Sequence, residues 1–196
     1  MIQHFPTLRT MPIRHALWVI IHVAQYISIT MASILNPITM SPSSSDCAAL
    51  ALILPGKVSF SGSPEYAARK SSYFTAFESE MSPICFVQPS NVDEVAKAVN
   101  QMRSSLLAGH TKVAIRSGGH TTWAGSANSL NGVTIDLSQL KTITIDPTTK
   151  VASIGVGNQW ADVYSKLSSQ KLAIVGGRVG KVGIGGLVIG GKLIIN

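Results

Sequence analysis

Two glycine-rich segments contain the residues with the clearest potential for chemistry. The first, Ser117-Gly118-Gly119-His120, directly follows an expected strand that ends at Arg116. Paired glycines at the end of a strand let successive backbone N–H groups converge on an anion, and the Ser117 hydroxyl adds a donor. Phosphate oxygens suit such a loop. The segment therefore predicts a site for a phosphorylated ligand beside His120.

The second segment, residues 176–191, contains eight glycines in sixteen residues. Such a glycine-rich backbone allows close approach by a flat chemical group or by another strand. Tight turns in a β-rich region are the simpler alternative. The usual dinucleotide fingerprint is absent, because no helical pattern follows the glycines and no acidic residue lies downstream.

The remaining composition excludes several other classes of protein. Only His110 and His120 follow the N-terminal leader, which excludes a multi-histidine metal site. Acidic residues are too sparse for a hydrolase built on paired carboxylates, and Asp136 is expected to accept hydrogen bonds. The net charge of +7 is spread along the chain and aromatic residues are 6%, which argues against a nucleic-acid partner. The site is therefore expected to bind a phosphorylated ligand, with any difficult chemistry supplied by a cofactor.

The N-terminal region differs in composition from the rest. Arg9 and Arg14 precede an apolar run over residues 16–32, which predicts a signal peptide or hydrophobic leader over residues 1–32. An uncleaved membrane anchor and a mis-assigned gene start are the alternatives. Residues 33–46 are expected to form a linker. The chain would then be secreted or lie in the lumen of the secretory pathway. The even pair Cys47 and Cys85 favours a disulfide in that setting, with two separate buried thiols as the alternative.

The expected elements belong to the α+β class. Residues 84–87 and 112–116 are expected strands on either side of a helix over 91–107, and this βαβ unit predicts two parallel strands. Short strands follow at 132–137, 142–145 and 151–156. Asn158 is expected to cap a helix in which Trp160, Val163, Tyr164 and Leu167 share one face. Residues 60–83 give little signal beyond a short helix starting at Ser63.

These segments resemble a known family. Residues from about 47 to 191 resemble the FAD-binding domain of the vanillyl-alcohol oxidase and berberine-bridge-enzyme family, in particular secreted fungal FAD-linked oxidoreductases of secondary metabolism. Residues 116–120 match the family's pyrophosphate loop, and residues 182–191 match its second cofactor-wrapping segment. Residues 125–128 continue the match. Cys47 and Cys85 fall where secreted members carry a disulfide.

The resemblance implies a fold and a cofactor. The fold would be a PCMH-type FAD-binding domain, with a small βαβ subdomain followed by a mixed or antiparallel β subdomain with flanking helices. The cofactor would be FAD, attached covalently through His120. The expected cofactor-binding residues are Ser117, Gly118, Gly119, His120, Ser126, Asn128, Val182, Gly183, Gly185 and Gly186.

The chain also departs from the family pattern. Val179 stands where members with a second covalent link have cysteine, so a single link is expected. Residues 47–196 are expected to be a C-terminally incomplete FAD-binding domain without the substrate domain, so no catalytic residue is assigned. The apolar run over residues 187–195 is expected to be an unpaired strand.

The resemblance also implies an activity for the intact relative. That protein would oxidise a small organic metabolite by hydride transfer to flavin, with oxygen as acceptor. A non-catalytic truncated remnant and a binding module for another phosphorylated nucleotide are the alternatives. A membrane would be a partner only if the leader were an uncleaved anchor.

Overall fold

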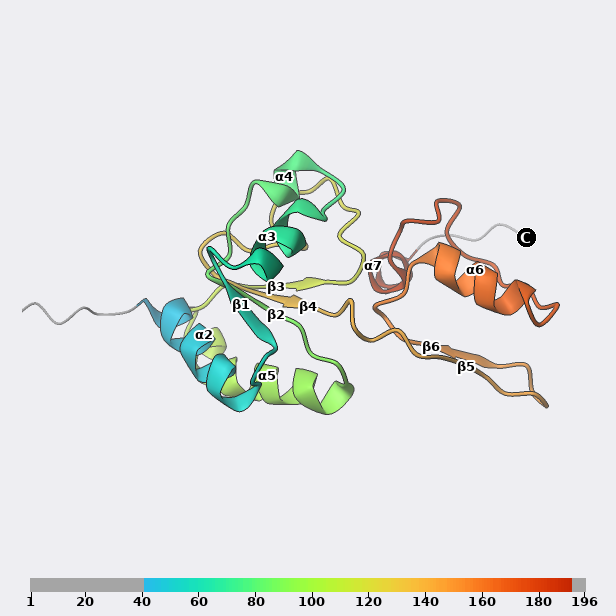
Figure 1. Ribbon diagram of the computed structural model, residues 1–196, viewed down its shortest axis with the longest axis horizontal. Helices are drawn as coiled ribbons and strands as arrows, with labels where there is room; N and C mark the ends of the chain where they lie inside the picture. The colour runs from blue at the N-terminus through green and yellow to red at the C-terminus, as the bar shows by residue number, and fades with distance from the viewer. Residues whose placement is uncertain (1–40, 192–196) are drawn as a thin grey trace, which may run out of the picture. The chain divides into compact units, whose positions relative to one another are not determined.

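A computed structural model describes residues 41–191, and the expected leader at residues 1–32 lies outside this range. Its larger sheet has four strands in the order β1-β2-β4-β3 (Figure 1). β1 runs antiparallel to β2, whereas β2 and β3 both run parallel to β4. These strands are β1 (Val58–Phe60), β2 (Cys85–Val87), β3 (Val113–Arg116) and β4 (Val133–Asp136).

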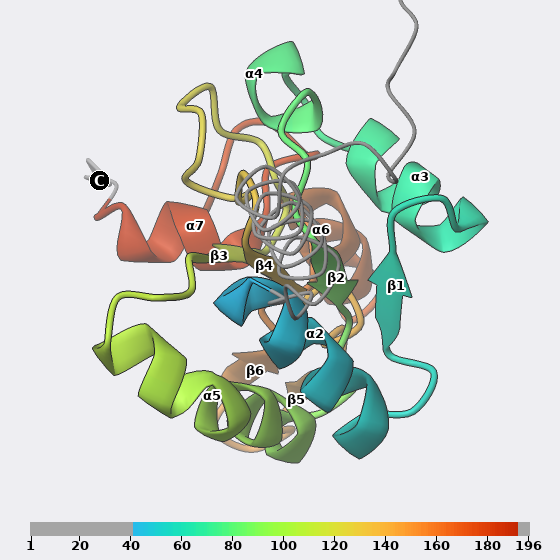
Figure 2. The ribbon, with the colours of Figure 1, turned by 90° about the vertical axis from the view of Figure 1, so that its left-hand side faces the viewer.

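Helices cover both faces of this sheet (Figures 1 and 2). α2 (Pro42–Ile53) and α5 (Val92–Leu107) lie on one face, and α3 (Pro64–Ser71) and α4 (Ala76–Ser79) lie on the other. Each face therefore has its own core. The first core includes Leu50, Met102 and Ile135, and the second includes Tyr66, Tyr73 and Phe86.

Strand β4 corrects the expected grouping of strands. The strand at residues 132–137 was expected to group with those at 142–145 and 151–156. Instead, β4 lies between β2 and β3 at the centre of the first sheet. All four of its residues are buried. A strand covered on both faces is typical of a parallel sheet with helices on each side. β2 and β3 are parallel as expected, but they are not neighbours.

Helix α2 includes the last residues of the expected linker at residues 33–46, of which residues 33–40 lie outside the described range. The helix begins at Pro42, and the Ser41 hydroxyl accepts a hydrogen bond from the Ser44 N–H group at 3.2 Å. Serine is a favoured N-cap and proline suits the first helical position, so this serine-rich stretch starts a helix. A disulfide between Cys47 and Cys85 joins α2 to β2, as the family resemblance implied.

The second part of the fold is a hairpin packed on a helix. β5 (Ile143–Ile145) and β6 (Ala152–Ile154) pair antiparallel, and α6 (Trp160–Ser168) packs against them. The expected face of α6 packs inwards: Trp160, Val163 and Leu167 are buried, and Tyr164 is partly buried against them. Within residues 41–191, no helix has the length and apolar character needed to cross a membrane.

Two expectations in this second part are wrong. Gln159 caps α6 in a capping box with Asp162, because the Asn158 side chain instead donates to the Gly155 carbonyl at 2.9 Å. Residues Ile184–Ile189 form helix α7, where the sequence predicted no helix and an unpaired strand beyond residue 187. Ile184 is buried against the core of α6, and this tertiary contact outweighs the β-propensity of the apolar run.

Candidate functional site

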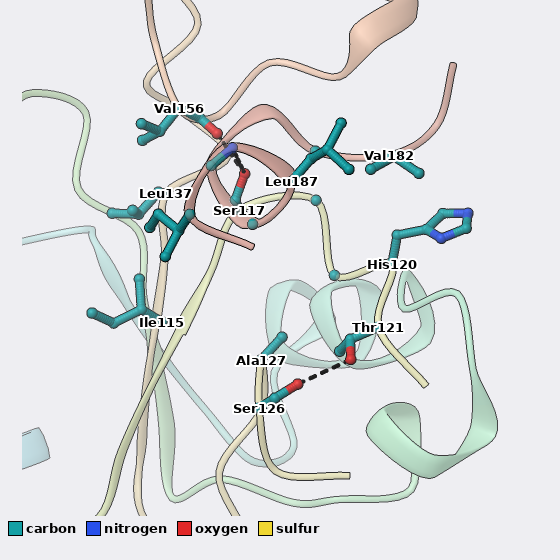
Figure 3. A pocket seen from close by; sticks show the side chains of 16 residues that line it. Ile115, Ser117, His120, Thr121, Ser126, Ala127, Leu137, Val156, Val182 and Leu187 are labelled. Carbon is teal, nitrogen blue, oxygen red and sulfur yellow. Dashed lines mark hydrogen bonds between the residues drawn. The ribbon is translucent and has the colours of Figure 1, made fainter. Parts of the chain in front are cut away.

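A cavity of about 550 Å³ opens at the carboxyl ends of β3 and β4 (Figure 3). Ligands of open α/β sheets bind outside the carboxyl ends of the strands, so this is the expected position for a site. The loop after β3 forms one wall and the segment leading into α7 forms another. Apolar side chains complete the cavity: Ile115, Ala127, Leu137, Val156, Leu187 and Ile189.

The cavity brings together nine of the ten residues that the sequence predicted to bind a cofactor. They are Ser117, Gly118, Gly119, His120, Ser126, Val182, Gly183, Gly185 and Gly186. The tenth, Asn128, is fully buried and does not line the cavity. Its amide donates to the carbonyls of Glu78 at 2.8 Å and Met81 at 3.1 Å. The Asn128 side-chain oxygen accepts from Ser129 and Thr134, so both polar atoms of this side chain bind the protein and stabilise the loop.

The glycines of the two segments have different roles. A Cβ atom on Gly118 or Gly183 would overlap the backbone of the other, so the two segments touch directly at these glycines. Gly176 and Gly177 lie against the indole of Trp160, which is the flat group that approaches this part of the backbone. A Cβ on Gly186 would meet nothing within 4 Å, although this residue lines the cavity. Gly186 therefore lines the cavity with no neighbouring atom close to its Cβ position.

The loop after β3 offers free hydrogen-bond donors. Within residues 41–191, the backbone N–H groups of Gly118, Gly119 and His120 donate no hydrogen bond to the protein. Gly119 has a φ of 63°, the left-handed conformation that turns successive amides towards one point. These amides are available to an anion.

The Ser117 hydroxyl is not a free donor, contrary to expectation. It donates to the Val156 carbonyl at 2.6 Å and accepts from the Gly185 N–H group at 3.2 Å. Ser117 therefore ties the first glycine-rich loop to the start of α7 and to the chain after β6.

Buried charges hold the loop from beneath. Arg116 donates to the carbonyls of Arg69 at 2.9 Å and Ser72 at 3.0 Å, and its guanidinium carbon lies 3.9 Å from the centre of the Tyr73 ring. The Arg116 Nη1 atom lies 3.8 Å from the Oδ2 atom of Asp136, which is fully buried. Arg116 therefore lies beside a carboxylate at the strand end and does not line the cavity. Burial raises the pKa of the Tyr73 phenol above its ordinary value of 10.0.

Three supporting residues were missed by sequence reasoning. The Tyr73 hydroxyl donates to the Ala127 carbonyl at 2.7 Å, and the Phe74 ring stacks on His120. Glu78, fully buried, accepts a hydrogen bond from the Ala127 N–H group at 3.0 Å. Residues 60–83 show no clear periodicity, and their partners lie some 45–55 residues further along the chain. No local pattern could have identified these contacts.

His120 lies at one edge of the cavity, on the side away from Ile115 and Leu137 (Figure 3). Its imidazole is half-buried and makes no hydrogen bond to the protein within residues 41–191. Both ring nitrogens are therefore free to meet a ligand.

Comparisons with known proteins point to one family. A family described as "FAD binding domain" matches residues 83–193. The FAD-dependent monooxygenase sdcF of Emericella nidulans is 39% identical over 146 residues, which cover 74% of this chain and 30% of the relative. An uncharacterized FAD-linked oxidoreductase of Arthroderma benhamiae is 32% identical, covering 70% of this chain and 27% of the relative. The chain thus spans less than a third of either relative.

Solved structures show the same fold. BBE-like 1 of Physcomitrella patens has a TM-score of 0.61 at 22% identity, covering 71% of this chain and 29% of that one. The 6-hydroxy-D-nicotine oxidase of Arthrobacter nicotinovorans has a TM-score of 0.56 at 27% identity, covering 66% of this chain and 27% of that one. The PCMH-type α+β fold expected from the sequence is therefore confirmed.

Proposed function

The chain belongs to the FAD-binding domain family of flavin-dependent oxidoreductases, and on this premise we propose that the cavity beside His120 holds FAD. The observation that carries the proposal is the row of free amides at Gly118, Gly119 and His120, next to an open apolar cavity. A dinucleotide needs both kinds of surface, since its pyrophosphate is anionic and its flavin ring is flat and largely apolar.

The residues of the cavity fit this cofactor. The three amides would donate to pyrophosphate oxygens, in the manner of other backbone anion sites. Ile115, Leu137 and Val156 give the cavity an apolar wall that suits a flat ring. Gly186 leaves space that any side chain would fill. Ser117 fixes the two glycine-rich segments together, so that the amides and the apolar wall keep their relative positions.

Covalent attachment through His120 is part of this proposal. An imidazole nitrogen of His120 would bond to the 8α-methyl carbon of the flavin, replacing one N–H and one C–H bond with an N–C bond. The two protons and two electrons released would reduce the flavin, which oxygen would then reoxidise. What supports this assignment is the position of His120 at the cavity edge with both ring nitrogens free of protein hydrogen bonds.

The activity of the intact relative is a further part of the proposal. When bound, FAD supplies a two-electron acceptor, which suits oxidation of a small organic metabolite by hydride transfer with oxygen as the final acceptor. The fungal relatives named as FAD-dependent monooxygenases support a role in oxidative metabolism, which we place in secondary metabolism. The disulfide supports passage through an oxidising, secretory compartment.

Titration of the flavin-free chain with FAD tests the binding site. We expect flavin fluorescence to change on binding, and we expect Gly186→Val to weaken binding about tenfold or more because its side chain enters the cavity. Val188→Thr is the matched control, since Val188 lies on the same helix, is exposed and does not line the cavity.

Competing ligands distinguish the alternatives. ADP-ribose or NAD binding as tightly as FAD would favour a module for another phosphorylated nucleotide. No binding of any of the three would favour a non-functional remnant and would contradict the proposal.

A further inference from the structure

Phe74 makes the contact that bears most directly on the orientation of His120. Its ring stacks on the imidazole with the ring centres 3.8 Å apart and the planes inclined by 11°. The Phe74 side chain remains 59% exposed, so burial in a core does not account for its position. An aromatic ring held at the surface against a histidine at the cavity edge needs another explanation.

The backbone around Phe74 is fixed to the glycine-rich loop. The Phe74 N–H group donates to the Gly119 carbonyl at 3.2 Å. The Thr75 hydroxyl donates to the Thr121 carbonyl at 3.0 Å. These two hydrogen bonds reach the residues on either side of His120. The backbone of Phe74 is therefore held next to the backbone on both sides of His120, which places the Phe74 ring within reach of the imidazole.

Stacking orients a histidine differently from hydrogen bonding. A histidine is usually held by a hydrogen bond to one ring nitrogen, which occupies that nitrogen. His120 makes no such bond within residues 41–191, and the Phe74 ring covers a face of the imidazole while its nitrogens lie at the ring edge. The stack can thus restrict rotation of the imidazole and still leave both nitrogens free.

We propose that Phe74 is a positioning residue that holds the imidazole of His120 in the orientation needed for its bond to the flavin. This inference rests on the proposed attachment at His120. Aromatic pairs contribute enough to change the population of an oriented side chain about two- to tenfold. Loss of the Phe74 ring therefore slows formation of the covalent bond by about this factor, with FAD still bound.

The rate of attachment tests this role. Flavin-free full chain is mixed with FAD, and acid-precipitated protein is sampled over time for bound flavin. We expect Phe74→Leu to slow the reaction about two- to tenfold at saturating FAD. Phe74→Tyr should restore the wild-type rate, because it keeps the ring. Phe77→Leu is the matched control, since Phe77 is 65% exposed on the adjacent helix α4 and does not stack on His120.

A second measurement needs no cofactor. In proton–carbon NMR spectra of the flavin-free chain, the Phe74 ring current should shift the His120 ring protons upfield. This shift should be lost in Phe74→Leu and kept in Phe77→Leu.

The outcomes separate this inference from the function on which it rests. Equal attachment rates in wild type and Phe74→Leu, or unchanged His120 shifts, would overturn the role of Phe74 and leave the attachment intact. A wild-type chain that binds FAD but never retains it after acid would overturn the attachment at His120 and the role of Phe74 with it.

Discussion

The loop at residues 117–121 and the segment at residues 176–191 are both rich in glycine, but they are held in different ways. The loop rests on buried charged and aromatic side chains, chiefly Arg116 and Tyr73, which come from the strand end and from a distant part of the chain. The later segment instead begins with two glycines, Gly176 and Gly177, that pack against the indole of Trp160. The two segments then meet backbone to backbone at Gly118 and Gly183.

This difference shows that a high glycine content can serve two purposes. In the loop after β3 it leaves backbone amides free for a ligand. In the later segment most of the close approaches are to the protein itself, and Gly186 is the position with open space beside the cavity. A substitution in the loop should therefore weaken ligand binding, whereas most substitutions in the later segment should weaken packing within the protein.

The largest loss of stability should come from removing the buried charge of Arg116, which contacts the loop. Arg116→Leu removes the buried cation beside Asp136, leaving only the partly exposed Arg69 at 3.7 Å, and it removes the donor to the Arg69 and Ser72 carbonyls. We expect unfolding to become easier by about 3–5 kcal/mol. Urea denaturation measures this loss. Arg178→Leu, an exposed arginine of the later segment, is the control and should change stability by less than about 0.5 kcal/mol. Similar losses of stability for Arg116→Leu and Arg178→Leu would refute the claim that the loop depends on the buried charge of Arg116.

A smaller loss of stability should distinguish two glycines of the later segment, Gly183 and Gly186. Gly183→Ala forces a side chain into the backbone of Gly118 and should cost about 1–3 kcal/mol. Gly186→Ala meets no neighbouring atom and lies in α7, so stability should be unchanged or rise by up to about 1 kcal/mol. The same denaturation assay compares them. If Gly186→Ala were as unstable as Gly183→Ala, the contact between the backbones of Gly183 and Gly118 would not explain the loss of stability.

The smallest of these effects should depend on pH. Tyr73→Phe removes the hydrogen bond to the Ala127 carbonyl and should cost about 1 kcal/mol at pH 8. Because burial raises the pKa of Tyr73 in the folded chain, the wild type should lose stability as the pH rises above about 10, where the unfolded tyrosine ionises first. The phenylalanine variant cannot lose this contribution. A difference between the two that stays constant from pH 8 to pH 11 would contradict the burial of a neutral phenol.

Local patterns predicted much of the fold. The helix expected over residues 91–107 agrees closely with α5, because the signals for a helix lie within a few residues of one another. Strands β5 and β6 also lie within the short strands expected at residues 142–145 and 151–156. The central position of β4 could not be predicted, since pairing order depends on contacts between distant strands.

The candidate site was predicted in part. Nine of the ten expected residues line the cavity, because a glycine-rich loop at a strand end is a local signal. Asn128 was misplaced, since its spacing does not reveal that its amide turns inwards to Glu78. Phe74 and Tyr73 were missed because their role depends on partners about 46 and 54 residues away.

Peptide mapping of flavin-loaded chain tests the central claim, that FAD lies in this cavity beside His120. The chain is saturated with FAD, precipitated with acid and digested. The mass of the peptide containing His120 is then measured by mass spectrometry. The account predicts that this peptide carries the mass of the flavin and that His120→Ala releases the flavin into the supernatant while still binding it before acid treatment. An unmodified His120 peptide, with the flavin bound to another peptide, would contradict the assignment of the site.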